Sequence, residues 1–575
     1  MTAPLRIGNC SGFYGDRLGA MRELLDGHPG VDVITGDYLA ELTMLILGKD
    51  RMRDASLGYA RTFVAQAEQC LGTALEPGVR IVANAGGLAE KLREVARGLG
   101  LDPAIAHVEG DDLLDRAAEL GLDGALTANA YLGAYGIATA LDAGADVVVT
   151  GRVTDASVVV GPAISPFGWS PDAYDALAGA VVAGHVIECG TQATGGNFSG
   201  FLALPRDDRP LGFPVAEVAA DGSCVITKQD GTGGAVTVDT VTAQLVYEVQ
   251  GPTYLNPDVA VDLTSIELAQ EGPDRVAISG VRGGPPPERL KVCVNELGGW
   301  RNSAEVVLTG LAIEEKAAWV RTQLEAAWSG GGRPATVDWA LARTDHPDAG
   351  TEEAASARLR CTVLDPSPDP VGKAFTGALV ELALASYPGF TLTAPPAKPT
   401  PYGVYRPAYV DRSAVTHTVV LPDGERRVVE EAAGRSSGVE TGSRQARPTR
   451  RSSGVETTTR VPLGTFVHAR SGDKGGDANV GVWVSRADAA SAEQYAARHA
   501  WLRETLTPDA VRALLPEAAD LAVEVHDLPN LGGLNILLPG LLGRGVAAST
   551  RFDPQAKAVG EWLRSRHVDV PEELV

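Results

Sequence analysis

The sequence lacks the features that mark several large classes of protein. Its six cysteines are scattered through 575 residues without CxxC or any other metal-ligand spacing, and a chain of this length does not need disulfide bonds to fold. No apolar run approaches the ~18 residues that cross a membrane. The amino terminus has no basic segment followed by the apolar core of a signal peptide. We therefore expect a cytoplasmic protein without a membrane partner.

Positive charge is also scarce. Fifty Lys and Arg residues stand against 73 Asp and Glu, which gives a formal net charge of −23. Nucleic-acid binding depends on clustered basic side chains, so we expect no nucleic-acid partner. With 44% hydrophobic and 21% charged residues, the composition is that of an ordinary globular protein, and the length predicts about two to four domains.

Several catalytic motifs are absent as well. The glycines of GNCSGFYG, at positions 8, 12 and 15, do not have the GxGxxG spacing, which disfavours NAD as a cofactor. Neither a GxSxG nucleophile elbow nor a GxxxxGK[ST] phosphate loop occurs. The nine histidines form no HExxH motif, and a structural zinc site is not expected.

The first third of the chain repeats one local pattern. RIGNCSGFYGDRLGAMRELLD, VDVITGDYLAELTMLIL, GVRIVANAGGLAEKLREVARGLG and GADVVVTGRVTDASVVVGP each have the pattern of a strand, a glycine-rich turn and a helix. This repetition predicts an α/β region with a parallel-type sheet. Ligands bind at the carboxyl ends of such strands, so we expect the turns to converge on one rim. The turn residues are Asn9, Ser11, Gly12, Asp16, Gly36, Asp37, Asn84, Gly86, Gly87, Gly151, Arg152 and Asp155.

Each of these turns also has a simpler explanation. Asn, Asp, Ser and Gly are what any tight turn or helix cap prefers. A single turn is therefore weak support for a ligand site, whereas four turns at one rim favour a shared pocket.

The composition changes after residue 200. Residues from about 203 to 300 contain β-like runs such as AVTVDTVTAQLVYEV and RLKVCVNEL between Gly, Pro and Asp turns, which predicts a β-rich insertion. Helical periodicity returns in AIEEKAAWVRTQLEAAW and KAFTGALVELALASY. We predict one large α/β region over residues 1–430, with subdomains of about 1–200 and 201–430 as an option.

Residues 434–460 differ from everything around them. This stretch holds six Arg, two Glu and no aromatic residue, and RSSGVET occurs in it twice, at 435–441 and 451–457. Such a segment buries too little apolar area to offset the entropy lost on ordering. We predict a disordered linker, with a basic ligand-binding arm as the alternative.

A compact module is expected over residues 461–575. Strand-like TFVHAR, VGVWVS, LAVEVHDL and LNILL accompany helical AEQYAARHAWLRETL, PDAVRALL and QAKAVGEWLRSR. This mixture predicts a small α+β domain of the open-faced sandwich type.

Four long motifs occur in order along the chain: ANAGG at 83–87, TGRVTDAS at 150–157, GHVIECGTQATGGNF at 184–198 and ARSGDKGGDANVG at 469–481. Through them the chain resembles the acyclic terpene utilisation protein AtuA family over nearly its whole length outside 434–460. The resemblance implies a large amino-terminal α/β region and a C-terminal ferredoxin-like domain. It also implies terpene catabolism, the bacterial breakdown of citronellol and geraniol, in which acetate is released from a branched 3-hydroxy-glutaryl-CoA-like thioester.

The last of these motifs concentrates charge among glycines. Lys474 and Arg470 supply a compact and a forked positive charge, and Gly472, Gly475 and Gly476 permit positive φ and close backbone approach. We expect a flexible loop that cradles a carboxylate or a phosphate. The Gly475-Gly476 pair is an addition to the usual family pattern. The alternative is a salt-bridged turn that docks one domain on the other.

The acidic residues of the same stretch leave several roles open. Asp473 and Asp477 can orient the cations or act as a general base. Together with Asn479 they can instead bind Mg²⁺ through oxygen ligands.

The motif ECGTQATGGNF brings Glu188 and Cys189 to the end of a predicted helix. Adjacent helical residues point about 100° apart, so the two do not form a dyad. Glu188 is the better candidate acid or base, whereas Cys189 fits a buried structural cysteine better than a nucleophile. Gly195, Gly196 and Asn197 follow in a loop that we expect to bind substrate.

TGRVTDAS follows the apolar run ADVVV and places Arg152 and Asp155 at the rim. Arg152 can hold a carboxylate in a bidentate manner that Lys cannot copy. The alternatives are an Arg152–Asp155 ion pair that stabilises the turn, or a helix cap from Asp155.

These motifs together predict an enzyme acting on an acyl-CoA or a comparable carboxylate by lyase or hydrolase-type chemistry. The expected catalytic residues are Glu188, Asp155, Arg152, Asp473 and Lys474. The expected substrate-binding residues are Asn9, Ser11, Asp37, Asn84, Gly86, Gly87, Gly195, Gly196, Asn197, Arg470 and Asn479. No metal ligand is assigned and Mg²⁺ stays open.

The sequence is also compatible with two other functions. The chain can be a non-catalytic binding or assembly subunit that works beside acyl-CoA carboxylases, or a metal-dependent hydratase. A homo-oligomer is expected of an acidic cytosolic enzyme of this size, although no heptad pattern specifies one.

Overall fold

The computed structural model describes residues 3–430 and 457–575. The predicted linker therefore lies outside the described residues up to residue 456. Its expected end at residue 460 is too late, because strand β21 (Thr458–Pro462) begins at Thr458 and pairs with β26 (His567–Pro571). The backbone hydrogen bonds of that pairing order residues whose composition alone suggests disorder.

The described residues form two compact units. The first comprises the described parts of Met1–Asn295, Tyr405–Val546 and Gln555–Val575, and the second comprises Glu296–Val404 and Ala547–Pro554. The first unit thus contains the amino-terminal sheet together with the expected C-terminal module.

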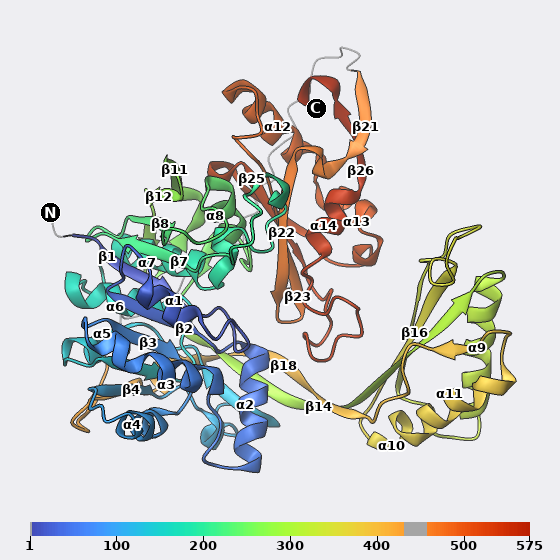
Figure 1. The fold of residues 1–575 in the computed structure, drawn as a ribbon, viewed down its shortest axis with the longest axis horizontal. Helices are drawn as coiled ribbons and strands as arrows, with labels where there is room; N and C mark the ends of the chain where they lie inside the picture. Colours follow the sequence, from blue (N-terminus) through green and yellow to red (C-terminus); the bar gives the residue numbers. More distant parts are fainter. Residues whose placement is uncertain (1–2, 431–456) are drawn as a thin grey trace. The chain divides into compact units, whose positions relative to one another are not determined.

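A sheet of eleven described strands is the scaffold of the first unit (Figure 1). Its parallel part has the order β1 (Leu5–Asn9), β2 (Val33–Asp37), β3 (Arg80–Asn84), β6 (Val147–Thr150) and β4 (Ile105–Glu109). Antiparallel strands extend it beyond β1 with β7 (Pro214–Val218), β8 (Cys224–Lys228), β12 (Arg275–Ser279) and β11 (Glu267–Gly272), and beyond β4 with β19 (Thr418–Val420) and β20 (Arg426–Val428).

Helices cover both faces of the parallel strands, because successive strand residues point to opposite faces. Ile34 and Ile81 pack with α1 (Ala20–Asp26), α3 (Arg61–Leu75) and α4 (Ala89–Gly98). Their neighbours Val33 and Val82 pack with α5 (Tyr135–Asp142), α6 (Ser157–Phe167) and α7 (Tyr174–Ile187). Helix α2 (Glu41–Arg53) follows β2. The predicted α/β architecture is confirmed.

One predicted strand is wrong. AVTVDTVTAQLVYEV contains helix α8 (Val238–Leu245), which begins with reciprocal hydrogen bonds between the side chains and backbone amides of Thr237 and Thr240. This capping box and the burial of Thr240 through Leu245 outweigh the β-propensity of Val and Thr. The rest of the insertion is β-rich, with a sheet of β9 (Thr253–Leu255), β10 (Ala260–Asp262) and β13 (Arg282–Gly284).

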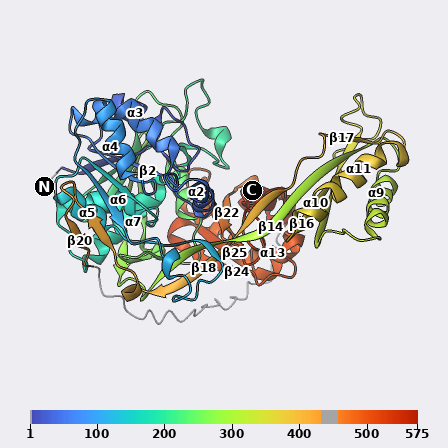
Figure 2. The same ribbon diagram turned by 90° about the horizontal axis from the view of Figure 1, so that it is seen from below.

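The second unit is built on the far part of β14 (Arg289–Thr309). The sheet order is β15 (Thr336–Ala342), β16 (Ser356–Asp365), β14 and β17 (Thr391–Leu392), and β5 (Ala125–Ala130) and β18 (Thr400–Asp411) also pair with β14. Helices α9 (Ile313–Trp328) and α11 (Lys373–Ala385) pack on one face of this sheet, with α10 (Pro368–Val371) beside them (Figure 2). Both long helices match the sequence prediction.

The C-terminal module is α+β, as predicted. Its antiparallel sheet has the order β22 (Val467–Lys474), β23 (Asp477–Val484), β25 (Gly533–Leu538) and β24 (Glu524–Leu528), and its helices are α12 (Ala492–Thr505), α13 (Pro508–Leu514) and α14 (Val559–Ser565). Asp239 of α8 accepts hydrogen bonds from Trp483 Nε1 at 3.1 Å and from Ser485 Oγ at 2.6 Å. The module is therefore tied to the amino-terminal region through α8.

No helix in residues 3–430 or 457–575 combines the length and the apolar character needed to cross a bilayer.

Candidate functional site

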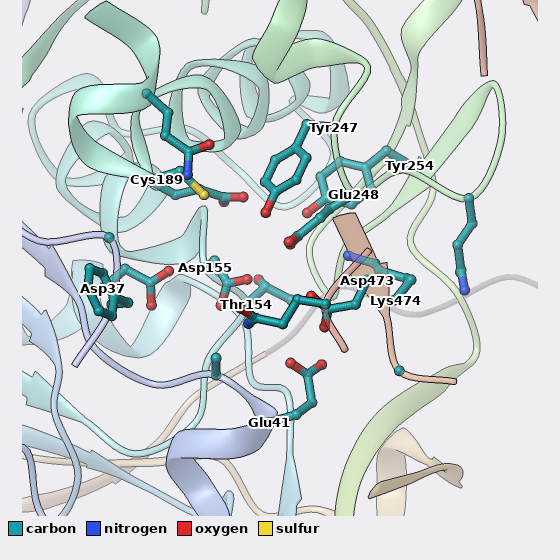
Figure 3. A pocket seen from close by; sticks show the side chains of 18 of the residues that line it. Asp37, Glu41, Thr154, Asp155, Cys189, Tyr247, Glu248, Tyr254, Asp473 and Lys474 are labelled. Carbon is teal, nitrogen blue, oxygen red and sulfur yellow. The ribbon is translucent and has the colours of Figure 1, made fainter. Parts of the chain in front are cut away.

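A pocket of about 1360 Å³ lies in the first unit (Figure 3). The carboxyl ends of β2 and β6, the end of α7, the segment from α8 to β9 and the tip of the β22–β23 hairpin all contribute to its wall. Of the expected catalytic and substrate-binding residues, eight line it: Asp37, Arg152, Asp155, Glu188, Gly196, Asn197, Asp473 and Lys474. The predicted rim residues Gly12 and Asp16 line it as well. The rim and the C-terminal stretch thus meet at one cavity.

The other eight predicted residues do not line this pocket. They are Asn9, Ser11, Asn84, Gly86, Gly87, Gly195, Arg470 and Asn479. Most of them hold the lining residues in place, as their contacts show.

Asn84 positions Asp37. Its Nδ2 donates to Asp37 Oδ1, and its Oδ1 accepts the backbone N–H groups of Tyr38 at 2.7 Å and Leu39 at 3.2 Å. Burial and the nearby charge of Asp155 raise the pKa of Asp37 well above its usual range. Asp37 therefore favours the neutral carboxylic acid inside the pocket.

Asn9 fixes the end of α7. Its Nδ2 donates to the carbonyl oxygens of Ser11 at 3.0 Å, Ile187 at 2.9 Å and Glu188 at 2.9 Å. The Ser11 hydroxyl donates to Phe13 O at 2.9 Å. Asn9 Oδ1 also accepts a hydrogen bond from Thr35 Oγ1 at 3.1 Å, so the Asn9 side chain is fully engaged within the protein and helps to set the position of Glu188.

Three of the expected substrate-binding glycines do not line the pocket, and the structure explains two of them, Gly86 and Gly195. Gly86 has a φ of +89°, and a Cβ there would lie 2.8 Å from Gly58 O. Gly195 has a φ of +114° at the end of the 3-10 helix Gly190–Thr194, and a Cβ would lie 2.3 Å from Leu204 Cδ1. A Cβ at Gly87 would meet nothing within 4 Å, and the structure gives no reason for that glycine.

Arg152 and Asp155 form the ion pair that the sequence offered as an alternative. The backbone N–H of Arg152 donates to Asp111 Oδ2 at 2.8 Å, its Nη1 donates to Val153 O at 2.9 Å, and its guanidinium lies 4.3 Å from the centre of the Tyr131 ring. Arg152 is only 1% exposed. The pair stabilises the turn and also presents Asp155 to the pocket.

Glu188 is held on one side only. His185 Nδ1 lies 3.2 Å from Glu188 Oε1, whereas the buried Oε2 has no hydrogen-bond partner among the described residues. Burial raises the pKa of Glu188, although His185 opposes the shift. Burial and the charge of Glu188 raise the pKa of the Cys189 thiol well above its ordinary value. Cys189 therefore stays a thiol, which disfavours its role as a nucleophile.

The expected flexible loop at 470–481 is wrong. Residues Val467–Lys474 and Asp477–Val484 are paired strands, joined by the two-residue turn Gly475-Gly476. Of the glycines in this stretch only Gly475 has a positive φ, +69°, which is the pattern of a type II′ hairpin turn. The hairpin carries Asp473 and Lys474 at its tip, where both line the pocket.

The same register separates the oxygen ligands proposed for Mg²⁺. Asp473 pairs with Ala478, and Gly472 pairs with Asn479, so Asp473 points to the opposite face of the hairpin from Asp477 and Asn479. Asp477 accepts the N–H of Gly540 at 2.8 Å, and Asn479 accepts that of Glu248 at 2.7 Å. These three side chains do not share one cation site. Residues 3–430 and 457–575 contain no cluster of three or more His, Cys, Asp or Glu side chains suited to a metal ion.

Arg470 lies behind the pocket wall. Its guanidinium stacks 4.2 Å from the centre of the Tyr247 ring and donates to Gln192 Oε1 and, at 3.4 Å, to Asn197 O. Arg470 therefore joins the C-terminal module to the loop after α7.

Sequence reasoning missed two groups of lining residues. In the first, Tyr131 donates to Glu41 Oε1 at 2.6 Å, and Lys291 Nζ lies 3.5 Å from the same oxygen. Burial raises the pKa of Glu41, but the charges of Lys291 and Arg152 outweigh it, so this pKa lies below its usual range. The lysine inside the otherwise apolar run RLKVCV was the signal for this group.

The second missed group is Tyr247, Glu248 and Lys557. Lys557 Nζ donates to the Tyr247 hydroxyl and lies 3.3 Å from Glu248 Oε1 and 3.6 Å from Asp473 Oδ1. Glu248 has a φ of +56°, a conformation that non-glycine residues rarely adopt and that clusters at functional sites. The apparent strand pattern around residues 235–249 concealed this group.

The charges of the pocket leave one ammonium group without an ion-pair partner. Four lining residues are Lys or Arg. Arg152 pairs with Asp155, Lys291 with Glu41 and Lys557 with Glu248, but among the described residues no carboxylate lies within 4.0 Å of the Lys474 ammonium. Burial lowers the pKa of Lys474, yet more distant carboxylates, first of all Glu248, outweigh burial and raise it. Lys474 is therefore charged and can pair with an anionic ligand.

Comparison with known proteins agrees with this architecture. The model of the acyclic terpene utilisation family protein AtuA matches residues 5–421, and that of the AtuA ferredoxin-like domain matches residues 461–569. No curated protein and no solved structure matches the chain. Because the first match alone covers more than half of the sequence, the chain belongs to the acyclic terpene utilisation protein AtuA family.

Proposed function

We propose that the protein is a lyase that releases acetate from a branched 3-hydroxy-glutaryl-CoA-like thioester. The observation that carries the proposal is the unpaired Lys474 ammonium inside a pocket whose other Lys and Arg side chains are each paired with a carboxylate. A guest carboxylate can pair with Lys474 without displacing any ion pair of the protein. The family's association with terpene utilisation supports a branched acid of this kind.

The charge balance of the pocket favours an anionic guest. Burial raises the pKa of Asp37 well above its usual range, so this carboxyl repels an anion less than an ionised aspartate does. Asp155 is neutralised by Arg152 and Glu41 by Lys291. A carboxylate beside Lys474 then forms a charge-assisted hydrogen bond, which is roughly twice as strong as a bond between neutral groups.

The size of the pocket suits a long ligand. Its volume of about 1360 Å³ exceeds the ~300–1,000 Å³ of most pockets that bind drug-sized molecules. The lining runs from Asp37 to Val525 and His526 of the C-terminal module. A thioester with a bulky thiol portion fits these dimensions better than a free short acid does.

Acetate release requires a base at the tertiary hydroxyl. When that O–H proton leaves, the hydroxyl oxygen forms a carbonyl, the bond to the CH2–COO⁻ group breaks, and the electron pair passes to that CH2 carbon. Protonation of this carbon yields acetate, and the thioester keeps the new ketone. Glu188 is better suited than Asp155 to be the base, because Glu188 Oε2 lacks a partner while Asp155 is bound to Arg152. Lys474 stabilises the charge on the departing carboxylate.

The test is incubation of the purified protein with 3-hydroxy-3-methylglutaryl-CoA and longer branched analogues, with free acetate and free thiol measured separately. We expect acetate without thiol from the wild-type protein, and a loss of about 100-fold or more in Glu188→Gln. For the variants Lys474→Met and Lys557→Met, Lys91→Met is the matched control, because Lys91 pairs with Glu94 on α4 and does not line the pocket.

Other outcomes identify the other functions. Release of thiol instead of acetate indicates a hydrolase, and activity that a chelator abolishes indicates a metal-dependent enzyme. Absence of any product, together with co-elution with an acyl-CoA carboxylase, contradicts the lyase and supports an assembly subunit.

A further inference from the structure

The proposed reaction needs an acid as well as a base, and the second group of missed residues offers one. Lys557 Nζ contacts the Tyr247 hydroxyl, the Glu248 carboxylate at 3.3 Å and the Asp473 carboxyl at 3.6 Å. All four side chains line the pocket. They come from three stretches of the chain, namely the segment after α8, the tip of β22 and the segment before α14.

We propose that Tyr247, Lys557 and Asp473 form a proton-transfer group, in which Tyr247 protonates the carbon that leaves as acetate while Lys557 and Asp473 restore the tyrosine proton. This inference rests on the proposed function and supplies its acid. Tyr247 would be the catalytic residue, because it meets the reacting carbon. Lys557 and Asp473 would act through it as positioning residues.

Tyr247 is held in one orientation. A Cβ at Gly472 would lie 2.4 Å from Tyr247 Cε2, so only glycine leaves room for the ring. The Arg470 guanidinium and the Lys557 ammonium lie 4.2 and 4.7 Å from the ring centre. The ring is only 2% exposed, and Figure 3 shows the labelled Tyr247 pointing into the cavity. A fixed donor of this kind loses little entropy when it reacts.

The protonation states of these residues suit a proton donor that is reprotonated after each turnover. Burial and the charge of Glu248 raise the pKa of Tyr247 well above its usual range, so the phenol keeps its proton at rest. Burial and Glu248 also raise the pKa of Asp473, to about 7. Asp473 is therefore the member that gains and loses a proton near neutral pH.

Glu248 stays ionised and sets this arrangement. Burial raises the pKa of Glu248, but the charges of Lys557 and Lys474 outweigh it and lower the pKa. Asn479 Oδ1 accepts the Glu248 N–H at 2.7 Å and so fixes the residue in its unusual backbone conformation. Its negative charge holds the Lys557 ammonium in place and disfavours a second negative charge on Asp473.

The group is separate from the proposed base. Glu188 Oε1 lies 3.2 Å from His185 Nδ1, whereas Lys557 Nζ lies 3.3 Å from Glu248 Oε1 and 3.6 Å from Asp473 Oδ1. In Figure 3 the labelled Asp473 and Lys474 lie on the opposite side of the cavity from Asp37 and Cys189. A substrate between them can lose a hydroxyl proton to one side and receive a carbon-bound proton from the other.

The proton transfers balance. Glu188 takes the hydroxyl proton as the carbon–carbon bond breaks. The Tyr247 O–H gives its proton to the CH2 carbon, a Lys557 N–H reprotonates the phenolate oxygen, and the Asp473 carboxylic acid returns a proton to Lys557. Water then takes the proton of Glu188 and supplies one to Asp473, so the protein ends as it began.

The first arm of the test follows acetate release from 3-hydroxy-3-methylglutaryl-CoA against pH. We expect Tyr247→Phe to lower kcat by about 100-fold or more while changing KM far less. The wild-type rate should fall as pH rises through about 7, the pKa of Asp473. Asp473→Asn and Lys557→Met should each lower kcat and abolish this decrease with pH, because the Asp473 proton reaches Tyr247 through Lys557. Asp477→Asn is the control, since Asp477 lies on the opposite face of the same hairpin.

The second arm needs no turnover. Calorimetry of 3-hydroxy-3-methylglutarate binding at pH 7, in two buffers of different ionisation enthalpy, counts the protons taken up on binding. We expect the wild-type protein and Asp477→Asn to take up part of a proton, and Asp473→Asn to take up less. Melting curves exclude misfolded variants.

The two arms separate the possible failures. One result is that the wild-type protein releases no acetate but takes up protons through Asp473 when it binds the acid. The proposed function is then wrong, whereas the assignment of Asp473 as the titrating residue is supported. If acetate is released by Tyr247→Phe as fast as by the wild-type protein, the inference is overturned and the proposed function stands. Binding without proton uptake, or no binding of the acid, also overturns the inference.

Discussion

The ring of Tyr247 occupies the space that any side chain at Gly472 would need. The distance from a Cβ at Gly472 to Tyr247 Cε2 would be 2.4 Å, well inside van der Waals contact. A glycine of the C-terminal module thus makes room for a pocket residue that follows α8. The glycine of this motif serves close packing between two distant segments, and not chain flexibility.

Gly472→Ala should therefore displace Tyr247 from the pocket. We expect acetate release to fall by about 10-fold or more, because a misplaced catalytic group loses its advantage steeply. Gly377→Ala is the control, since Gly377 lies in helix α11 and a Cβ there would meet nothing within 4 Å. Equal activity of Gly472→Ala and the wild-type protein would show that the ring position is unimportant.

Lys474 and Arg470 should behave differently when each is replaced by Met. Lys474→Met removes the unpaired ammonium of the pocket, so binding of 3-hydroxy-3-methylglutarate should weaken by about 10-fold, in line with a charge-assisted hydrogen bond. Arg470→Met removes a buried contact to Gln192, Asn197 and Tyr247, so its main effect should be a lower melting temperature. Calorimetry and melting curves on both variants test the difference. The same loss of affinity in both would place Arg470 in the binding site after all.

Asp473 should make the protein less stable as pH rises. Its folded-state pKa of about 7 lies above the ~3.9 of an unfolded aspartate, so the folded protein holds more protons between these values. Its stabilising contribution is full below about pH 4 and is lost as pH rises through about 7. Asp473→Asn should thus raise the melting temperature at pH 8 by about 1–3 °C, and by less at pH 5. A shift of the same size at both pH values would contradict the raised pKa.

Asn84→Ala should destabilise the protein although Asn84 does not line the pocket. The variant leaves the buried N–H groups of Tyr38 and Leu39 without an acceptor, which costs about 1–3 kcal/mol. It also frees Asp37, so both the unfolding free energy in urea and the affinity for the acid probe should fall. Unchanged stability would mean that other groups or water satisfy these amides.

The sequence predicted the amino-terminal part of the site because its geometry is local. Asp37, Arg152 and Asp155 follow buried strands, and the carboxyl ends of parallel strands must share one edge. Asn84 and Asn9 were expected at the same edge for the same reason. The sequence pattern does not tell a side chain that faces the ligand from one that faces the backbone behind it, because turns prefer the same residue types for both purposes.

The missed residues depend on packing between distant segments. Lys557 comes just before a short helix whose sequence looks like an ordinary surface helix, and it reaches the pocket only because α14 packs on β22. Tyr247 and Glu248 were concealed because the β-branched run before them predicted a strand where burial produces helix α8. The hairpin was mistaken for a loop because its glycines suggested flexibility, whereas pairing with β25 orders the strand that follows them.

The pocket wall takes its charged groups from distant stretches of the chain, with Asp37, Arg152 and Glu188 before the midpoint of the sequence and Asp473, Lys474 and Lys557 after it. If these two segments were separate polypeptides, the complete pocket would form only when they met, and its amount would fall steeply with dilution. Because both segments belong to one chain, their effective concentration is fixed. The number of complete pockets then depends only on the amount of protein.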